Sequence, residues 1–320
     1  MSSSGGTKAV LAALGANLGI AVVKFLAFAL TLSSSMLAEG IHSVADSGNQ
    51  VLLLIGGRKA RRNADLQHPF GYGRERYIYG FIVAIVLFAV GGLFALYEGY
   101  HKIVHPEPID EWQWVPIVVL VVSIALEGNS FRTAWVESKI SRGDTPVVQY
   151  IRRAKAPELP VVLLEDTAAL VGLVLALFGV GLTLLTGNGV WDGVGTLAIG
   201  VLLVAVASVL AVETKSLLLG ESATAANVRA IEAAIVDGPE VERVIHMRTL
   251  HLGPDELLVA AKIAVHHDDT AARIAHGIDA VEARIRSAVP IARVIYLEPD
   301  LFVAEQAPPP GAAEAPRGAV

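Results

Sequence analysis

The sequence of 320 residues contains no cysteine and little charge. Lys, Arg, Asp and Glu together make up only 18% of it, whereas hydrophobic residues make up 53% and the mean hydropathy is +0.55. The absence of cysteine excludes disulfide bonds and thiolate ligands, so a transition-metal site must use His, Asp, Glu or backbone oxygen. The scarcity of charge is typical of an integral membrane protein with a soluble appendage.

Several sequence patterns of other protein classes are also missing. The first residues show no short apolar stretch followed by a small-residue cleavage site, so we expect no removable signal peptide. The sequence has no His-Glu-x-x-His pair and no nucleophile motif with partners, which argues against an intramembrane enzyme.

Six segments are apolar and long enough to cross a bilayer. We place them at 9–31, 35–56, 77–97, 114–134, 160–186 and 190–213. Basic residues cluster in the loops after the second and fourth segments: Arg58, Lys59, Arg61, Arg62, Arg74 and Arg76, then Lys139, Arg142, Arg152, Arg153 and Lys155. The positive-inside rule then predicts that both loops and both termini are cytoplasmic. Because topology explains the basic loops, we expect no nucleic-acid partner.

The composition changes after Lys215 to that of a soluble domain. Hydrophobic periodicity predicts the order helix, strand, strand, helix, strand, an α+β domain of type αββαβ. The predicted elements are Ala226–Val236, Val241–Leu252, Glu256–His266, Ala271–Ala288 and Ala292–Leu297, with a turn at Gly253–Asp255. We therefore expect a membrane domain at 1–215, a cytoplasmic domain at 216–302 and a disordered tail at 303–320.

The second apolar segment carries a narrow polar stripe. Glu39, His42, Asp46 and Asn49 are spaced by three, four and three residues, which places them within about one quadrant of a helix. A carboxylate near the bilayer centre costs at least about 2.5 kcal/mol, so a cation, a proton or a partner charge must compensate for the stripe.

The spacing of His42 and Asp46 suits two ligands of one metal ion, although a buried hydrogen bond gives the same spacing. Asp166 is the second clear intramembrane carboxylate, and with it the set offers nitrogen and oxygen ligands but no sulfur. Zn²⁺ fits such a set, as do Mn²⁺, Fe²⁺, Co²⁺ and Cd²⁺ with different strengths. Since ligands must lose their protons to bind metal, the same residues can couple metal movement to proton movement.

Four stretches resemble the cation diffusion facilitator family, in the subgroup that includes zinc transporter 9. They are Ser35–Asp46, the His-Pro-Phe-Gly-Tyr-Gly run in His68–Glu75, Val162–Gly172 and Leu217–Glu221. The resemblance covers residue 8 to about residue 300. It implies an α-helical membrane protein with six transmembrane helices and a metallochaperone-like cytoplasmic domain. It also implies a homodimer and antiport of divalent metal against protons, out of the cytoplasm.

The chain departs from the family pattern in the fifth segment. Zinc-transporting members have a histidine where this chain has Val162. Glu165, Glu127, Glu39 or water are candidates to complete the metal shell. Glu165 also suits the start of a helix, where carboxylates are favoured by the dipole. Glu127 is equally compatible with a helix–helix hydrogen bond.

Two further metal sites of the family fall on altered residues. The site before the third segment maps to Asp65 and His68, with Tyr72 at its third ligand position; the alternative for His68 is a residue that orders the turn. The site in the soluble domain is expected to be degraded, since Lys262 and Tyr296 stand where histidines are expected. Its nearest candidates are His246, His251, His266, His267, His276, Tyr296 and Glu298.

These observations predict an exporter of a divalent transition metal, foremost Zn²⁺ in exchange for H⁺, in a bacterial cell membrane. An exporter of Mn²⁺ or Fe²⁺ is the first alternative, because an oxygen-rich site without the second histidine favours harder ions. A transport-inactive membrane scaffold is the second.

Overall fold

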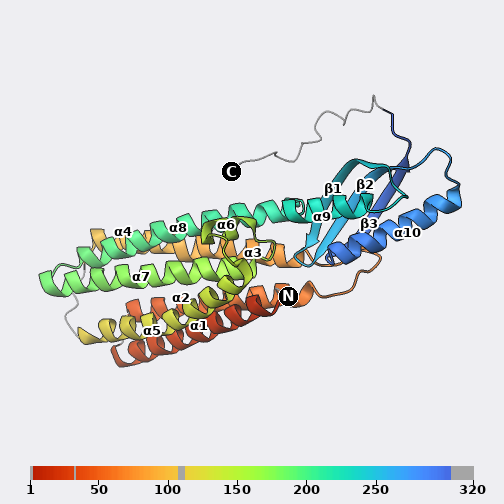
Figure 1. Ribbon diagram of the computed structural model, residues 1–320. Helices are drawn as coiled ribbons and strands as arrows, with labels where there is room; N and C mark the ends of the chain where they lie inside the picture. The colour runs from red at the N-terminus through yellow and green to blue at the C-terminus, as the bar shows by residue number, and fades with distance from the viewer. Residues whose placement is uncertain (1–2, 32–33, 107–111, 304–320) are drawn as a thin grey trace. The chain divides into compact units, whose positions relative to one another are not determined.

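We analysed a computed structural model of the chain (Figure 1). It describes residues 3–31, 34–106 and 112–303. The chain divides into two units, Met1–Leu219 and Gly220–Val320, and each is described by itself. The tail predicted to be disordered lies outside the described residues, apart from Val303.

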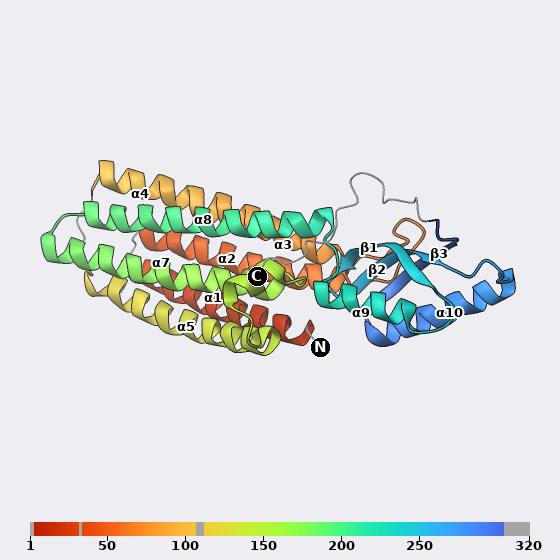
Figure 2. The same cartoon turned by 45° about the horizontal axis from the view of Figure 1, so that its top comes forward.

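The first unit is made of helices. They are α1 (Ser3–Thr31), α2 (Ser34–Lys59), α3 (Glu75–Val86), α4 (Phe94–Val104), α5 (Trp114–Arg142), α6 (Val147–Arg153), α7 (Glu158–Thr186) and α8 (Val190–Leu219), with a π-helix, η1 (Leu87–Leu93), joining α3 to α4. The third predicted segment is therefore one continuous helical run with a π-helical turn in its middle. Helix α2 packs along α1 and also contacts α3, and α8 packs on α7 and α4 (Figure 2).

Among the residues that the structure describes, five helical stretches are long and apolar enough to cross a membrane: Gly6–Leu30, Glu75–Val104, Trp114–Arg142, Glu158–Thr186 and Val190–Leu219. They correspond to five of the six predicted segments. The remaining segment is α2, a helix of 26 residues whose polar stripe lowers its hydropathy below that of the others.

Glycines allow α8 to approach α4 closely. A Cβ atom added at Gly99 would lie 2.5 Å from the backbone nitrogen of Leu197, and one added at Gly200 would lie 2.7 Å from that of Leu96. Such distances are far inside van der Waals contact, so larger residues at these positions would force the two helices apart.

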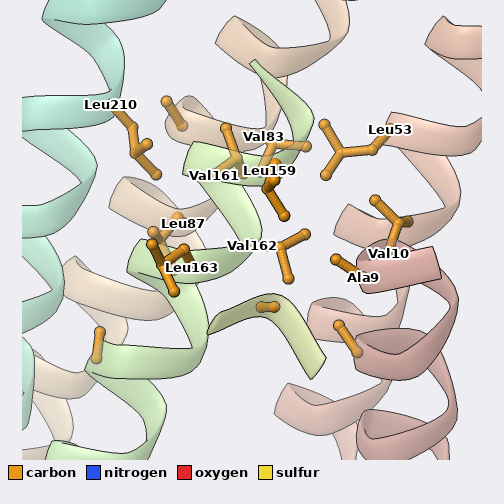
Figure 3. Close-up of a cluster of buried hydrophobic side chains, with 14 of the residues drawn as sticks. Ala9, Val10, Leu53, Val83, Leu87, Leu159, Val161, Val162, Leu163 and Leu210 are labelled. Carbon is orange, nitrogen blue, oxygen red and sulfur yellow. The ribbon is translucent and has the colours of Figure 1, made fainter. Parts of the chain in front are cut away.

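The apolar core of this unit surrounds the first turns of α7. Leu159, Val162 and Leu163 are almost completely buried there, together with Val10 of α1 and Leu53 of α2 (Figure 3). Val162, the position of the family's histidine, has an exposed fraction of 0% and is part of this cluster. Its side chain fills apolar space, which explains why a valine is accommodated.

The second unit confirms the predicted order αββαβ. Its elements are α9 (Ala225–Val236), β1 (Arg243–Gly253), β2 (Glu256–Ala264), α10 (Ala271–Ala288) and β3 (Ala292–Asp300). The sheet order is β1-β2-β3, with β2 antiparallel to β1 and parallel to β3. Side chains of α9 and α10 form one core with those of β2, including Ile231, Ile235, Leu257, Ile263 and Ile285.

Candidate metal site in the helical unit

The polar stripe of α2 brings His42 and Asp46 together. The Nε2 atom of His42 lies 3.6 Å from Oδ2 of Asp46, and both side chains are 27% exposed. The Nδ1 atom of His42 is buried and has no hydrogen-bond partner among the described residues. On its other side the ring faces η1, since a Cβ atom added at Gly91 would lie 3.9 Å from Cε1 of His42. A buried imidazole nitrogen without a partner is a group that a cation can satisfy.

Asp166 lies on α7 and points toward α5. Its side chain is buried, and its Oδ2 atom accepts a hydrogen bond of 2.7 Å from the hydroxyl of Ser130. Glu127, also on α5 and also buried, is within hydrogen-bonding reach of the same carboxyl group. Sequence reasoning did not identify Ser130, although its position three residues after Glu127 puts both on one face of α5.

Glu165 points away from Asp166, as the step of about 100° between successive helical residues requires. Its two oxygens accept hydrogen bonds from the side-chain amides of Asn49, at 3.0 Å, and Gln50, at 2.9 Å. Gln50 in turn accepts a bond of 3.4 Å from Asn17 on α1. The alternative of a helix-start carboxylate is therefore replaced by a specific polar network that joins α1, α2 and α7. Gln50 was missed because it follows the stripe directly and lies off its face.

Four carboxyl groups from three helices interact in this part of the unit. The charge of Asp46 acts on Glu165 and on Glu127, and Asp166 and Glu165 act on Glu127. In the part of the chain that the structure describes, no three or more His, Asp or Glu side chains are grouped so that they could hold one ion. The structure thus gathers the predicted residues in one electrostatic neighbourhood, with His42 and Asp46 in contact and Asp166 bound to α5.

Glu39, the first residue of the stripe, already has a cationic partner. The ammonium group of Lys24 lies 3.4 Å from its Oε2 atom, and Lys24 is almost completely buried. This ion pair offsets the burial of the Lys24 charge without a metal ion, whereas the Glu39 side chain is 41% exposed.

The loop pair Asp65 and His68 is held by a local network. Oδ1 of Asp65 accepts hydrogen bonds from the backbone nitrogens of Gln67 and His68, and Oδ2 accepts one of 2.6 Å from the hydroxyl of Tyr72. The bond from Tyr72, followed by that from the His68 backbone, holds the pKa of Asp65 below its usual value of 3.8. The ring of His68 lies on that of Tyr72 with centroids 4.4 Å apart. Here the tyrosine cross-links the loop with a hydrogen bond.

The histidines of the second unit are dispersed. His251 is buried, with Nδ1 3.2 Å from the carbonyl oxygen of Gly253, whereas His266 contacts Glu242 at 2.9 Å. His246 pairs in register with Lys262, whose ammonium group binds Asp300 at 2.9 Å and Glu298 at 3.0 Å. These bonds, that of Asp300 first, raise the pKa of Lys262, so a cation already occupies the position next to these acids. His267 contacts its neighbour Asp268, and His276 and Tyr296 are exposed.

A family model described as "Cation efflux transmembrane domain" matches residues 10–219. The chain belongs to the cation efflux family. It is 33% identical over 242 residues to the mouse protein "Proton-coupled zinc antiporter SLC30A9, mitochondrial"; that match covers 75% of this chain and 42% of the mouse protein. It is 28% identical over 258 residues to "Metal tolerance protein C4" of Arabidopsis thaliana, covering 80% of this chain and 56% of that protein.

A third relative matches over more of its own length. An uncharacterized transporter of Synechocystis sp. is 24% identical over 287 residues, which is 89% of this chain and 88% of that protein. The mouse and plant relatives are longer, and the chain spans about half of their length or less. The chain thus belongs to a family of membrane transporters and not of enzymes.

Proposed function

We propose that the protein exports a divalent transition metal, foremost Zn²⁺, in exchange for protons. The observation that carries this proposal is the contact on α2 between Nε2 of His42 and Oδ2 of Asp46, 3.6 Å apart, which one ion can bridge. The name of the mouse relative, a proton-coupled zinc antiporter, supports the choice of ion.

His42, Asp46 and Asp166 are the proposed ligands. Asp46 and Asp166 belong to a group of carboxyl groups whose mutual repulsion a dication would relieve. In alternating access the ligands need to converge only in the ion-loaded state, so a shift of α2 relative to α5 and α7 would bring Asp166 to the pair. Glu127 and Glu165 would then support the site from α5 and α7, and Glu39 would remain with Lys24.

Proton coupling follows from the chemistry of the same ligands. A neutral imidazole and ionised carboxylates bind the metal, and protons compete for those groups on the side where the ion leaves. The ion and the protons therefore exclude each other from the site, which is the requirement for antiport.

We propose six transmembrane helices: the five apolar stretches named above and, in addition, α2. Its polar side chains contact α1 and α7 through Lys24 and Glu165, so they avoid lipid despite the low hydropathy of the helix. The basic loops support an orientation with both termini in the cytoplasm, and we propose a bacterial cell membrane as the location. The second unit would act as the cytoplasmic dimerisation domain of a homodimer with twofold symmetry.

Export of Mn²⁺ or Fe²⁺ is the second candidate function, and Val162 is the observation that favours it. Without a histidine at this position the ligands on α7 are oxygen atoms, which suit harder ions. A membrane scaffold without transport activity is the alternative outside the class of transporters.

Flux into proteoliposomes under an imposed pH gradient tests these functions. The full chain is reconstituted and supplied in turn with Zn²⁺, Mn²⁺ and Fe²⁺. We expect flux that rises with the proton gradient and is lost in Asp46→Ala and in Asp166→Ala. Unchanged flux in both variants would remove the proposed site, and no flux of any ion at any pH would favour the scaffold.

A further inference from the structure

The C-terminal end of α4 carries two histidines that the proposed transport site does not use. His101 and His105 are both exposed, and their ring centroids lie 5.1 Å apart. His105 is the residue directly after α4, and its backbone nitrogen donates a hydrogen bond of 2.8 Å to the carbonyl oxygen of His101, so the helical hydrogen-bond pattern reaches it. Side chains four residues apart lie on one helix face, and this spacing suits two imidazole ligands of one metal ion.

The surroundings of the two rings favour a cation. They lie on the last turn of a helix, where the carbonyl dipoles carry partial negative charge. Lys102, the residue after His101, forms an ion pair with Asp192 of α8, with 2.9 Å between Nζ and Oδ2. Its charge is thereby neutralised and held against α8. The net field at the pair is therefore compatible with an incoming dication.

Neighbouring side chains also limit the orientation of the two rings and the further ligands that could join them. The ring of Tyr97 stacks on His101 at 6.2 Å, one turn earlier on the same face, and restricts the orientation of that imidazole. Glu98 lies three residues before His101, and its charge acts on Lys102. Among the described residues no third His, Asp or Glu side chain is grouped with the two rings, so water would complete the shell.

We propose that His101 and His105 form a second metal site, which binds an imidazole-preferring divalent ion such as Cu²⁺, Ni²⁺ or Zn²⁺. The site lies at the far end of the helical run that begins at Glu75, about 45 Å from its start at 1.5 Å per residue. Binding at this site stands independently of the transport proposal. Its role as a site that meets exported ions on the non-cytoplasmic face rests on the proposed function and its topology.

Copper binding to the full chain in detergent micelles tests the site. Cu²⁺ is the probe because it binds imidazole most strongly of these ions and its coordinating nitrogens are visible by pulsed electron paramagnetic resonance. The measurement uses a His42→Ala background, so that the proposed transport site does not contribute. We expect a bound Cu²⁺ with two imidazole nitrogens. Loss of either ring in His101→Ala or His105→Ala should lower its affinity by at least about tenfold.

Two control variants make the result specific. His276→Ala removes an exposed histidine of α10, and Glu98→Gln removes the neighbouring carboxylate; both should leave the spectrum and the affinity unchanged. An identical spectrum and affinity in the double variant His101→Ala/His105→Ala would overturn the proposal. Flux assays report on the transport site of α2. If Asp46→Ala loses transport but keeps the signal of two imidazole nitrogens, the two sites are independent.

Discussion

Two His–Asp pairs of almost the same geometry lie in different regions of this protein. His42 and Asp46 on α2 approach to 3.6 Å, and His68 and Asp65 in the loop before α3 approach to 3.5 Å. The side chains on α2 are 27% exposed, whereas those in the loop are 52% and 44% exposed. The residue types and the distance are therefore not what separates the two regions.

The difference lies in the remaining bonding capacity of each pair. In the loop, both oxygens of Asp65 already accept hydrogen bonds, and Tyr72 supplies the shortest of them. On α2, Nε2 of His42 and Oδ2 of Asp46 face each other at 3.6 Å, a separation that a single ion bound to both atoms can bridge. A metal ion in the loop would have to replace the hydrogen bonds that Asp65 already accepts.

The largest expected difference between the two pairs is their effect on transport. Asp46→Asn removes a charged ligand and should lower metal flux by at least about 100-fold, the upper range for damage to the surroundings of a metal site. Asp65→Asn is the matched change in the loop and should leave flux within about twofold, since an amide oxygen still accepts the backbone bonds. Zn²⁺ flux into proteoliposomes measures both. Equal losses in the two variants would show that the comparison is wrong.

The next effect concerns stability around the α2 pair. Glu165→Ala leaves the amides of Asn49 and Gln50 buried without an acceptor, at about 1–3 kcal/mol for each group. Glu165→Gln keeps one carbonyl oxygen and should lose less. Thermal unfolding in micelles should therefore rank wild type above Glu165→Gln and Glu165→Ala last. Equal midpoints for the two variants would mean that the hydrogen bonds add nothing.

Restoring the family's histidine should not repair the α2 site. Val162 is completely buried among apolar side chains such as Leu53 and Val10, so Val162→His introduces a polar ring where no hydrogen-bond partner is expected. We expect a loss of about 1–3 kcal/mol of stability and no gain in Zn²⁺ affinity. Val162→Leu controls for added volume alone. A tighter Zn²⁺ site in Val162→His, measured by titration calorimetry, would contradict this.

The fold was largely predictable because periodicity governs it. The alternation in β1 and β2, and the turn at Gly253–Asp255, gave the sheet domain with the correct order of elements. Most ends of the apolar segments fell within three residues of the helix ends. The third, fourth and sixth segments continue beyond their predicted ends, in α4, α5 and α8, and α1 begins six residues before its predicted start. The π-helix η1 was not predicted, because it depends on how Gly91 and Gly92 pack against α8 and not on a sequence period.

The site was predictable only where residues share one helix. The spacing of His42 and Asp46 follows from the sequence alone, since both lie on α2. The partners of Glu165 and Asp166 come from other helices, so a single sequence does not reveal that Gln50 bonds to Glu165 or that Ser130, although on one face with Glu127, bonds to Asp166. Tyr72 was located at a ligand position, but its hydrogen bond to Asp65 depends on the conformation of the loop.

The smallest expected effect concerns the loop pair, and it is a change in the pKa of Asp65. Tyr72→Phe removes the hydrogen bond that contributes most to the lowered pKa of Asp65, so this pKa should rise toward 3.8. A group with a lowered pKa stabilises the folded loop above its unfolded pKa, and that contribution is lost as the pH falls through the folded value. The stability of the folded loop should thus differ between wild type and variant at neutral pH and become equal in acid. Carbon NMR of labelled aspartate gives the titration midpoint directly. An identical midpoint in Tyr72→Phe would mean that the backbone bonds alone hold Asp65, and that the tyrosine is not what distinguishes the loop pair from the pair on α2.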